Sequence, residues 1–467
     1  MKIYYSLFFY CLILAVFGCK KFVHIDPPNT VLVTNSVFSS SGSATAALLN
    51  IYQDMQSTSF AIAQSCGLLS DELANDYSSD ITLRQYYTNS MLATNSNIRF
   101  WIYAYRYIYQ ANAIIEALQN SEKIAAPIKN QIVGESKFIR AFFYFYLTEC
   151  YGDVPKVVGT DYTHNAGIAR SSRAEIFQLM ITDLTDADNL LNSYFVDGTD
   201  TTVTTDRVRP TKWAAESLLA RVYLYAGDYD KAEKEATNVI NNSSLFYLES
   251  DLNSVFLANS NEAIWQLAVP LPTNYNTLDG AGFILISTPS TGNAQTNTIS
   301  QELLSAFELG DKRKDNWIGS ITNSTGTFLF PYKYKVRQSS NVTEYTMMLR
   351  LAEQYLIRAE ARAQKNVDLL GAVADLDSIR NRAGLDHYTG LVDKPSLLKA
   401  ILHERQVELF AEWGNRWFDL IRTGNVGMVM DSIAPLKGGG WNSNKQLFPI
   451  PQSERILDIN LSQNPGY

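Results

Sequence analysis

Residues Pro210 to Asn241 read PTKWAAESLLARVYLYAGDYDKAEKEATNVIN, and this stretch decides the fold. Apolar and small residues follow helical spacing on both sides of a turn at Gly227, so the stretch predicts two antiparallel helices. Ala220 and Ala232 are small enough to let these helices approach closely, and the larger Tyr223 fills the space beside them. The stretch therefore predicts a closely packed helical hairpin.

The same pattern is typical of the tetratricopeptide repeat, a helix pair that stacks on its neighbours to form a scaffold. Its helix signature returns at Phe138 to Ala141 and at Tyr355 to Ala359. These copies lie within two long helical stretches, Gly134 to Tyr151 and Arg350 to Arg382. Because the copies are dispersed rather than tandem, long insertions must separate them.

Two other segments are predicted to be helical. From Trp101 to Leu118 the apolar residues recur with helical spacing, and although the tyrosines also alternate as in a strand, the pattern is too long for a usual strand. A last helical block runs from Ser396 to Arg422 and precedes an irregular tail that contains Gly438 to Gly440.

The longest interruption lies at about Leu245 to Tyr345, where Asn, Ser, Thr, Gly and Pro are frequent and β-like runs such as Phe328 to Tyr332 are short. A loop region of this length in a compact domain is usually functional. We therefore predict an all-α fold in which a tetratricopeptide-like helix-pair scaffold, at about 44–240 and 346–425, carries long irregular insertions and a few short β-hairpins. Residues 44–467 are expected to form a single domain.

The N-terminus carries a targeting signal. Lys2 is followed by a nearly unbroken apolar stretch from Ile3 to Phe17, which is typical of a signal peptide. A membrane-spanning helix needs roughly 20 apolar residues, and this stretch ends earlier, at Gly18. We expect residues 1–18 to be the signal peptide.

The sequence Val16-Phe17-Gly18-Cys19 resembles a bacterial lipobox, in which a small residue precedes a cysteine that is acylated and becomes the mature N-terminus. Cys11 fits less well, because the bulky Tyr10 precedes it. Two or more acyl chains hold a protein stably on a membrane, whereas one does not. We expect Cys19 to be lipidated and residues 19–43 to form an extended leader; a simple secreted protein with an incidental cysteine is the alternative.

The composition excludes several classes of ligand. The chain has 39 Lys and Arg against 47 Asp and Glu, a formal net charge of −8, and no basic block, so nucleic acid is not an expected partner. Four His and four Cys are widely spaced and leave little material for a metal site, and we predict neither a metal nor a cofactor. Aromatic residues are abundant instead, with 27 Tyr, 22 Phe and 7 Trp.

Cys66 and Cys150 are the cysteines that remain after signal processing and lipidation. An oxidising exterior permits a bridge between them. Two buried free cysteines are the simpler interpretation, since two cysteines in a large chain are no disulfide framework.

Motifs for catalysis begin but are not completed. His403-Glu404 starts a zinc-protease motif, but Val407 stands where the second histidine is needed. Asp71 and Glu72 could in principle act as acid and base in glycoside cleavage, but adjacent carboxylates are more simply a capping or solvated pair. Charged residues of the C-terminal helical block, Ser396 to Arg422, are expected to form i, i+4 ion pairs on one helix. They are Glu404, Glu408, Glu412, Arg405 and Arg416. No catalytic residue is predicted.

Six parts of the chain carry long and specific motifs: Cys19 to Phe22 with Asp26 to Pro28; Gly134 to Pro155; Pro210 to Ala232; Leu349 to Ala361; His403 to Arg422; and Leu447 to Ser453 with Gln463 to Tyr467. Together they resemble the SusD/RagB family, the surface glycan-binding lipoproteins that partner outer-membrane transporters. The resemblance covers nearly all of the chain, with small departures at His24 and Asp458, where members often have Glu and Asn. Lys20-Lys21 follow the lipidated cysteine where some members carry acidic surface-export signals.

The resemblance implies a SusD-like body with four tetratricopeptide-type helix pairs, and a second, irregular region at about 245–345 that carries the ligand site. It implies a protein without catalysis, held on the outer membrane through the Cys19 lipid anchor and facing the cell exterior. The expected partners are an oligosaccharide and a SusC-like TonB-dependent barrel, which contacts the scaffold side and receives the sugar.

A neutral oligosaccharide offers apolar C–H faces and a ring of hydroxyls, so its receptor needs flat aromatic side chains together with Asn, Asp and Arg. The family's ligand residues are not part of its motifs, and the candidates therefore come from the loops. Trp101 and the aromatic run from Phe142 to Tyr146 are expected in the core instead. The candidates are Asp71, Arg84, Tyr86, Tyr87 and Asn95 before the Trp101 helix, and Tyr275, Phe283, Trp317 and Tyr332 in the insertion.

Two other functions stay open from the sequence. One is a helical-repeat scaffold that binds only protein or peptide partners and needs no sugar platform. The other is a surface glycoside hydrolase, which needs two carboxyl groups placed across the scissile bond. The sequence does not name the sugar, its linkage or its length.

Overall fold

The computed structural model describes residues 37–467 except 76, 96–99, 120, 291 and 293–295. The predicted signal peptide, the Cys19 lipidation site and most of the leader lie outside the described residues. Within the described part, no helix combines the length and the apolar character needed to cross a bilayer.

Helices make up most of the described chain and strands are short. The α-helices are α3 (Ser41–Asp54), α4 (Thr58–Leu69), α5 (Ile81–Tyr87), α6 (Phe100–Gln119), α7 (Ala126–Tyr151), α8 (Tyr162–Asn165), α9 (Arg173–Leu190), α10 (Lys212–Ala226), α11 (Tyr229–Ile240), α12 (Leu278–Phe283), α13 (Gln301–Ala306), α14 (Lys312–Trp317), α15 (Leu351–Lys365), α16 (Leu369–Arg382), α17 (Lys394–Glu408), α18 (Asn415–Arg422), α19 (Val426–Leu436) and α20 (Gln452–Leu457). The strands are β1 (Leu73–Ala74), β2 (Val154–Pro155), β3 (Arg170–Ser171), β4 (Ala263–Leu267), β5 (Thr298–Ile299), β6 (Ile318–Asn323), β7 (Gly326–Pro331) and β8 (Thr346–Arg350).

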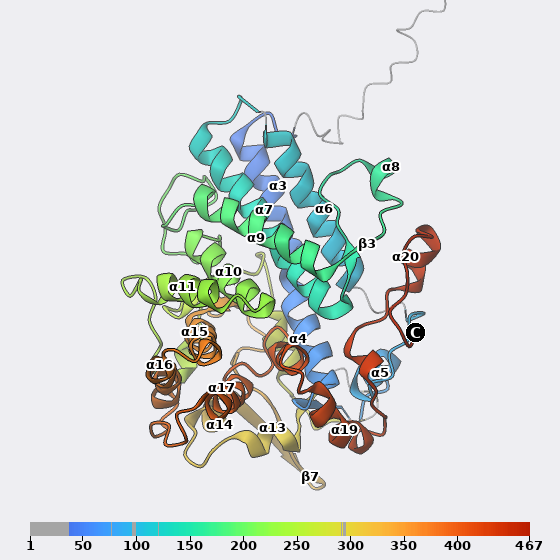
Figure 1. Ribbon diagram of the computed structural model, residues 1–467, viewed down its shortest axis with the longest axis vertical. Helices are drawn as coiled ribbons and strands as arrows, with labels where there is room; N and C mark the ends of the chain where they lie inside the picture. Colours follow the sequence, from blue (N-terminus) through green and yellow to red (C-terminus); the bar gives the residue numbers. More distant parts are fainter. Residues whose placement is uncertain (1–36, 76, 96–99, 120, 291, 293–295) are drawn as a thin grey trace, which may run out of the picture.

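The long helices pack in a continuous series (Figure 1). Helix α7 packs on α6 and α9, α10 packs on α9 and α11, and α15 packs on α11 and α16, while α17 covers α15 and α16. Because α11 contacts α15 although about a hundred residues separate them in the chain, the intervening segment is looped out of the scaffold. This arrangement confirms the predicted all-α helix-pair fold.

The stretch from Pro210 to Asn241 forms the predicted hairpin. Helix α10 ends at Gly227, whose φ of 78° lies in the left-handed region that glycine adopts without strain. Ala220 and Ala232 are fully buried at the contact between α10 and α11, and Tyr223 is 7% exposed beside them. The small residues therefore mark the close approach of the two helices, as expected.

An aromatic core joins the scaffold to the rest of the molecule. Every residue from Phe142 to Tyr146 on α7 is buried, as is Trp101 on α6. The ring of Phe142 makes edge-to-face contacts with Trp265 of β4 at 5.5 Å and with Trp413 at 5.1 Å, measured between ring centroids. The prediction that these aromatic residues belong to the core is confirmed.

The predicted helical block from Ser396 to Arg422 is two helices, α17 and α18. The chain between them turns sharply, with positive φ angles at Ala411, Trp413 and Gly414. Cys66 of α4 packs so closely here that a Cβ on Gly414 would lie 2.7 Å from the Cys66 Cβ. The expected irregular tail also contains α20, and α19 precedes it, so the C-terminal part is more helical than its Gly and Pro residues indicated.

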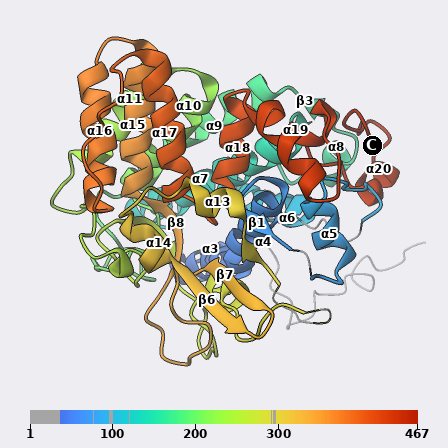
Figure 2. The ribbon, with the colours of Figure 1, turned by 90° about the horizontal axis from the view of Figure 1, so that it is seen from below.

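Paired strands fasten the long insertion to the scaffold. At its base β4 pairs with β8, antiparallel, and β5 pairs with β1 at the end of α4. In between, β6 and β7 form a hairpin that projects from the lower edge of the molecule in Figure 2. The insertion therefore lies against α4, which its helix α12 contacts.

Candidate functional site

A cavity of about 350 Å³ lies between α4, α5 and α6, and we call it the α4–α6 cavity. Its lining mixes aromatic rings with hydroxyl and amide groups. Ligand pockets in proteins commonly measure about 300–1,000 Å³, so this cavity can take a small ligand group. The residues that line it are Ser57, Thr58, Ala61, Ile62, Gln64, Ser65, Asp80, Thr82, Leu83, Tyr86, Phe100, Tyr103 and Phe448.

Helix α5 and its N-terminal cap bring polar and aromatic lining residues to one side of the cavity. Asp80 begins the helix, because its Oδ1 accepts two backbone N–H groups of the first turn at 2.7 and 3.2 Å. Thr82 and Tyr86 are four residues apart and therefore share a helix face. Asn95 supports this face, since its Oδ1 accepts the Thr82 hydroxyl at 3.2 Å and its Nδ2 donates to Gln85 at 2.7 Å.

The aromatic lining comes from α5 and from the first turn of α6. Phe100 and Tyr103 are half-buried, so part of each ring stays accessible, whereas Tyr86 is only 6% exposed. The Arg106 guanidinium carbon lies 5.2 Å from the centre of the Tyr103 ring and supports it from the side. Burial raises the pKa of the Tyr86 phenol, despite an opposing hydrogen bond from Ser65, so this group remains neutral.

The cavity is nearly free of charge. Asp80 is the single charged side chain in the described lining, and its carboxylate is already engaged at the start of α5. Hydroxyl and amide groups of Ser57, Gln64 and Ser65 face the same space as the rings. Flat apolar faces combined with uncharged hydrogen-bonding groups suit a neutral, polyhydroxylated ligand.

Two aromatic contacts connect this region with the insertion. Phe60 of α4 packs edge-to-face on Phe283 of α12, with 5.0 Å between ring centroids. Tyr77, which follows β1, packs edge-to-face on Phe328 of β7 at 5.8 Å and keeps 41% of its surface exposed. The residues predicted before the Trp101 helix and those predicted in the insertion therefore belong to neighbouring parts of the fold.

The predictions that Trp317 and Phe283 offer aromatic faces to a sugar are wrong, because both side chains are buried. Trp317 is fully enclosed, and its indole N–H donates to the Leu252 carbonyl at 3.0 Å. The ammonium group of Lys333 lies 4.7 Å from the centre of the Trp317 ring. Phe283 is 3% exposed under Phe60, so neither residue can offer a ring face to a ligand.

Asp71 is a structural residue rather than a ligand contact. It is 5% exposed, and Arg416 donates to its two carboxylate oxygens at 2.8 and 2.6 Å. Its neighbour Glu72 is 1% exposed, so the predicted capping or solvated pair is in fact buried. Burial and the Asp71 charge raise the pKa of Glu72 to about 8. Neither carboxyl lines the α4–α6 cavity, so this pair is not placed for glycoside cleavage there.

The remaining candidates take several positions. Tyr86 lines the cavity and Asn95 supports it, while Arg84 is exposed on α5. Tyr87 is half-buried with the Lys437 ammonium 5.2 Å from its ring centre. Tyr275 and Tyr332 are half-buried in the insertion, outside the described lining of the cavity.

Sequence reasoning missed Phe100, Tyr103 and Asp80. The first two are three residues apart at the start of α6, on a face distinct from the buried Trp101 face. Phe100 and Tyr103 form a second aromatic stripe on this helix, directly after a polar loop, and this stripe could have indicated a ligand-binding face. Asp80 was visible only as a helix-capping residue before an apolar turn.

A second polar region is fully enclosed, and its charges are paired. Arg350 is 2% exposed and donates to Glu412 at 2.8 and 2.9 Å, to Glu408 at 2.6 Å and to Glu262 at 2.9 Å. Arg313 binds Glu408 from the other side at 2.9 Å. We call this group the buried ionic cluster.

The prediction of i, i+4 pairs along one helix is therefore wrong, although the structural role is right. Glu404 and Glu408 lie on α17, but Glu412 follows its end, and their partners come from other elements. Arg405 and Arg416 bind Asp419 and Asp71, respectively. Hydrogen bonding between separated segments holds the C-terminal helices on the insertion.

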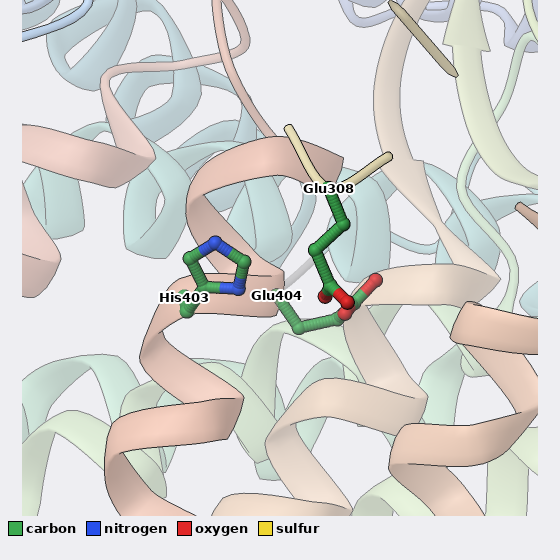
Figure 3. A group of neighbouring side chains, drawn as sticks. All are labelled: Glu308, His403 and Glu404. Carbon is green, nitrogen blue, oxygen red and sulfur yellow. The ribbon is translucent and has the colours of Figure 1, made fainter. Parts of the chain in front are cut away.

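Glu308, His403 and Glu404 form a group whose ligand atoms lie within 4.8 Å of one another (Figure 3). Their carboxylates are already neutralised: Arg380 donates to Glu308 at 2.5 and 3.1 Å, and Arg313 donates to Glu404 at 2.6 Å. A divalent cation here would have to displace a guanidinium group. The geometry therefore favours an ion-pair cluster over a metal site.

Cys66 and Cys150 are buried and free in the described structure. Burial raises the pKa of the Cys150 thiol, and the neighbouring Cys66 raises it further. This agrees with the interpretation of two buried free cysteines.

The fold is a scaffold of helix pairs, and the α4–α6 cavity lies at its edge, between α4, α5 and α6. Two family profiles match the chain: the SusD family at residues 311–467, and a family described as starch-binding associating with outer membrane at residues 22–224. The chain belongs to the SusD family.

Known relatives agree with this assignment over the full length. SusD-like protein P2 of Formosa agariphila is 27% identical over 526 aligned positions, which cover 99% of each chain. Among solved structures, a SusD homolog from Bacteroides thetaiotaomicron has a TM-score of 0.77 at 19% identity, covering 93% of this chain and 98% of that one. A laminarin-binding SusD-like protein has a TM-score of 0.73 at 22% identity, covering 91% and 99%. At these identities the solved structures support the fold alone.

Proposed function

We propose that this protein is a glycan-binding lipoprotein of the outer membrane that captures a neutral oligosaccharide without cleaving it. The observation that carries the proposal is the α4–α6 cavity, in which accessible rings of Phe100 and Tyr103 face hydroxyl and amide groups with almost no charge. The sugar's C–H faces stack on the rings and its hydroxyls bond to the polar lining. A matching family is described as starch-binding, which supports a carbohydrate ligand.

The proposal extends to location and partner. The lipobox-like sequence ending at Cys19 and the family description of outer-membrane association support a lipid anchor there. We propose that the anchored protein faces the cell exterior and delivers its sugar to a SusC-like TonB-dependent barrel. This role requires binding and release, and no bond breaking.

Isothermal titration of the purified protein against a panel of neutral oligosaccharides tests the binding function. At least one oligosaccharide is expected to bind, and its chain length should be unchanged after prolonged incubation. Failure of every saccharide to bind would overturn the proposed function, and release of reducing sugar would favour the hydrolase instead.

The location is tested separately in cells. Replacing Cys19 by Ala should move the protein from the membrane fraction to the soluble fraction, because the acyl chains are lost. Protease added to intact cells should degrade the wild-type protein, and a mild-detergent pull-down should recover a large β-barrel. Protection from the protease would contradict exposure at the surface.

A further inference from the structure

A second and larger cavity lies within the helix scaffold. It measures about 870 Å³, against about 350 Å³ for the α4–α6 cavity, and we call it the scaffold cavity. Its walls come from the end of α10, the start of α11, and helices α15, α17, α18 and α19. These elements belong to the tetratricopeptide-like part, so this cavity is separate from the site described above.

The charge of the scaffold cavity differs from that of the α4–α6 cavity. Lys399, Arg416 and Arg422 line it together with His403, whereas Glu360 is the single carboxylate in the described lining. The whole chain is acidic, with a formal net charge of −8. A local excess of cations in an acidic protein favours an anionic ligand.

Carboxylates in and beside the lining pair with the two arginines, but those that the structure describes leave Lys399 unpaired. Arg422 donates to Glu360 at 2.5 and 2.7 Å and to Asp419 at 2.8 Å, and Arg416 is paired with Asp71. Lys399 is exposed at the mouth and makes no ion pair with a described residue. One cationic side chain thus stays available to a ligand.

Arg405 lies behind the cavity wall rather than in its described lining, and it too carries unused donors. It lies on α17 directly before the lining residue Gln406, and its Nε donates to Asp419 at 2.7 Å. Its Nη1 and Nη2 are buried and have no hydrogen-bond partner among the described residues. A buried guanidinium with unused N–H groups is costly unless water or a ligand oxygen satisfies it.

The uncharged part of the lining is suited to a sugar ring. Tyr229 is half-buried at the start of α11, opposite apolar side chains such as Leu398 and Leu402 of α17. Gln364, Thr423 and other amide and hydroxyl groups share the lining. The cavity therefore combines an aromatic and apolar wall with polar groups and a cationic side.

We propose that the scaffold cavity binds a carboxylate-bearing sugar, a uronic acid residue of an acidic oligosaccharide. The carboxylate pairs with Lys399, and the pyranose ring lies along Tyr229 and the leucine wall. This inference rests on the proposed carbohydrate-binding function, and it adds a second site with a different charge preference.

The test compares acidic trisaccharides with neutral ones of the same backbone. Trimers of galacturonate, glucuronate and mannuronate, and their carboxyl-reduced forms, are titrated into the full-length protein by calorimetry at low and high salt. At least one acidic trimer should bind at least tenfold more tightly than its reduced form, and more weakly in high salt. Equal affinity for the acidic and reduced forms, or no binding of any acidic trimer, would overturn the proposal.

Variants assign the binding to this cavity. Ala226 is exposed and lines the cavity, so Ala226→Trp should block the acidic trimer, and Lys399→Gln should weaken it about three- to tenfold. Lys123→Gln is the matched control, because Lys123 is also exposed and lies outside the described lining, and it should bind as the wild type does. Unchanged acidic binding by Ala226→Trp would contradict the assignment.

Failure of this inference and failure of the proposed function give different results. Tyr103→Ala alters only the α4–α6 cavity, so it should weaken a neutral ligand and leave the acidic trimer unaffected. Neutral oligosaccharide binding without any acidic binding would remove the scaffold site and leave the proposed function intact. Acidic binding that is lost in Tyr103→Ala would place the acid in the α4–α6 cavity and overturn the proposal.

Discussion

The buried ionic cluster and the α4–α6 cavity are both rich in polar side chains, but they use them differently. In the cluster, Arg350 meets Glu262, Glu408 and Glu412 within 3 Å, and each of these four residues is at most 9% exposed. In the cavity, uncharged hydroxyls, an amide and the half-buried rings of Phe100 and Tyr103 face open space. Polar groups that satisfy one another hold the fold, whereas those directed into a cavity are available to a ligand.

Breaking the cluster should have the largest effect. Arg350→Met leaves three buried carboxylates without their shared partner, which should lower the free energy of unfolding by about 3–5 kcal/mol. Urea denaturation followed by circular dichroism measures this change, and loss of soluble protein would report the same effect. Arg84→Met, at an exposed position on α5, should change stability by less than about 0.5 kcal/mol. Equal stability of the two variants would contradict the structural role of the cluster.

A buried carboxyl without a paired cation should behave differently from the cluster. The pKa of Glu72 is raised to about 8, so the folded protein holds a proton there that the unfolded chain releases above about pH 4.5. The free energy of unfolding is therefore highest, as far as Glu72 is concerned, below about pH 4.5, where the carboxyl is protonated in both states. It falls as the pH rises toward 8, because only the folded state still holds the proton. Glu72→Gln should remove this dependence and make the protein more stable than wild type at pH 8, by on the order of 2–3 kcal/mol.

Urea denaturation of both proteins at pH 5 and at pH 8 measures this difference. The two stability values should converge at pH 5 and separate at pH 8. Parallel pH profiles for wild type and Glu72→Gln would show that Glu72 ionises normally in the folded state.

Removing a ring from the cavity should affect binding rather than folding. Tyr103→Ala takes away an accessible aromatic face, which should weaken a neutral oligosaccharide at least tenfold, about 1.4 kcal/mol. Tyr109→Ala is the matched control, because Tyr109 lies on the same helix, is 50% exposed, and is not part of the described cavity lining. Calorimetry should find wild-type affinity for the control, and equal losses in both variants would argue against the cavity as the site.

The smallest expected effect concerns the border between the cavity region and the insertion. Tyr77 keeps 41% of its surface exposed while packing on Phe328 of the β6–β7 hairpin. If longer sugars extend toward the insertion, Tyr77→Ala should weaken a hexasaccharide about two- to fivefold and leave a disaccharide unchanged. A loss that is the same for both lengths would contradict this extension.

The scaffold was predictable because its signals are local. The spacing of Ala220, Gly227 and Ala232 specified a helix pair. The length of the apolar pattern from Trp101 to Leu118 decided between helix and strand. The break between α17 and α18 was not predicted, since two of the residues with positive φ there, Ala411 and Trp413, are not glycines, and Cys66 of α4, which packs against Gly414, is far away in sequence. Tertiary contacts of this kind leave no local pattern.

The candidate site was only partly predictable for a related reason. Tyr86 was proposed as a loop residue, and it lies on α5 in the lining of the cavity. Trp317 was misassigned because a loop tryptophan and a buried one look alike in sequence. The ion pairs of Glu404 and Glu408 fitted an i, i+4 spacing while their true partners lie on other segments. Burial and long-range pairing are properties of the folded chain, and they separate structural polar residues from ligand-binding ones.

Oxidative footprinting with mass spectrometry tests the central claim most directly, namely that an intact neutral sugar occupies the α4–α6 cavity. A neutral oligosaccharide that binds the wild-type protein should protect Phe100 and Tyr103 from hydroxyl radicals, while the exposed Tyr109 stays reactive. The sugar recovered afterwards should have its original length. Unchanged oxidation of Phe100 and Tyr103 at saturating sugar, or recovery of shortened sugar, would contradict the account.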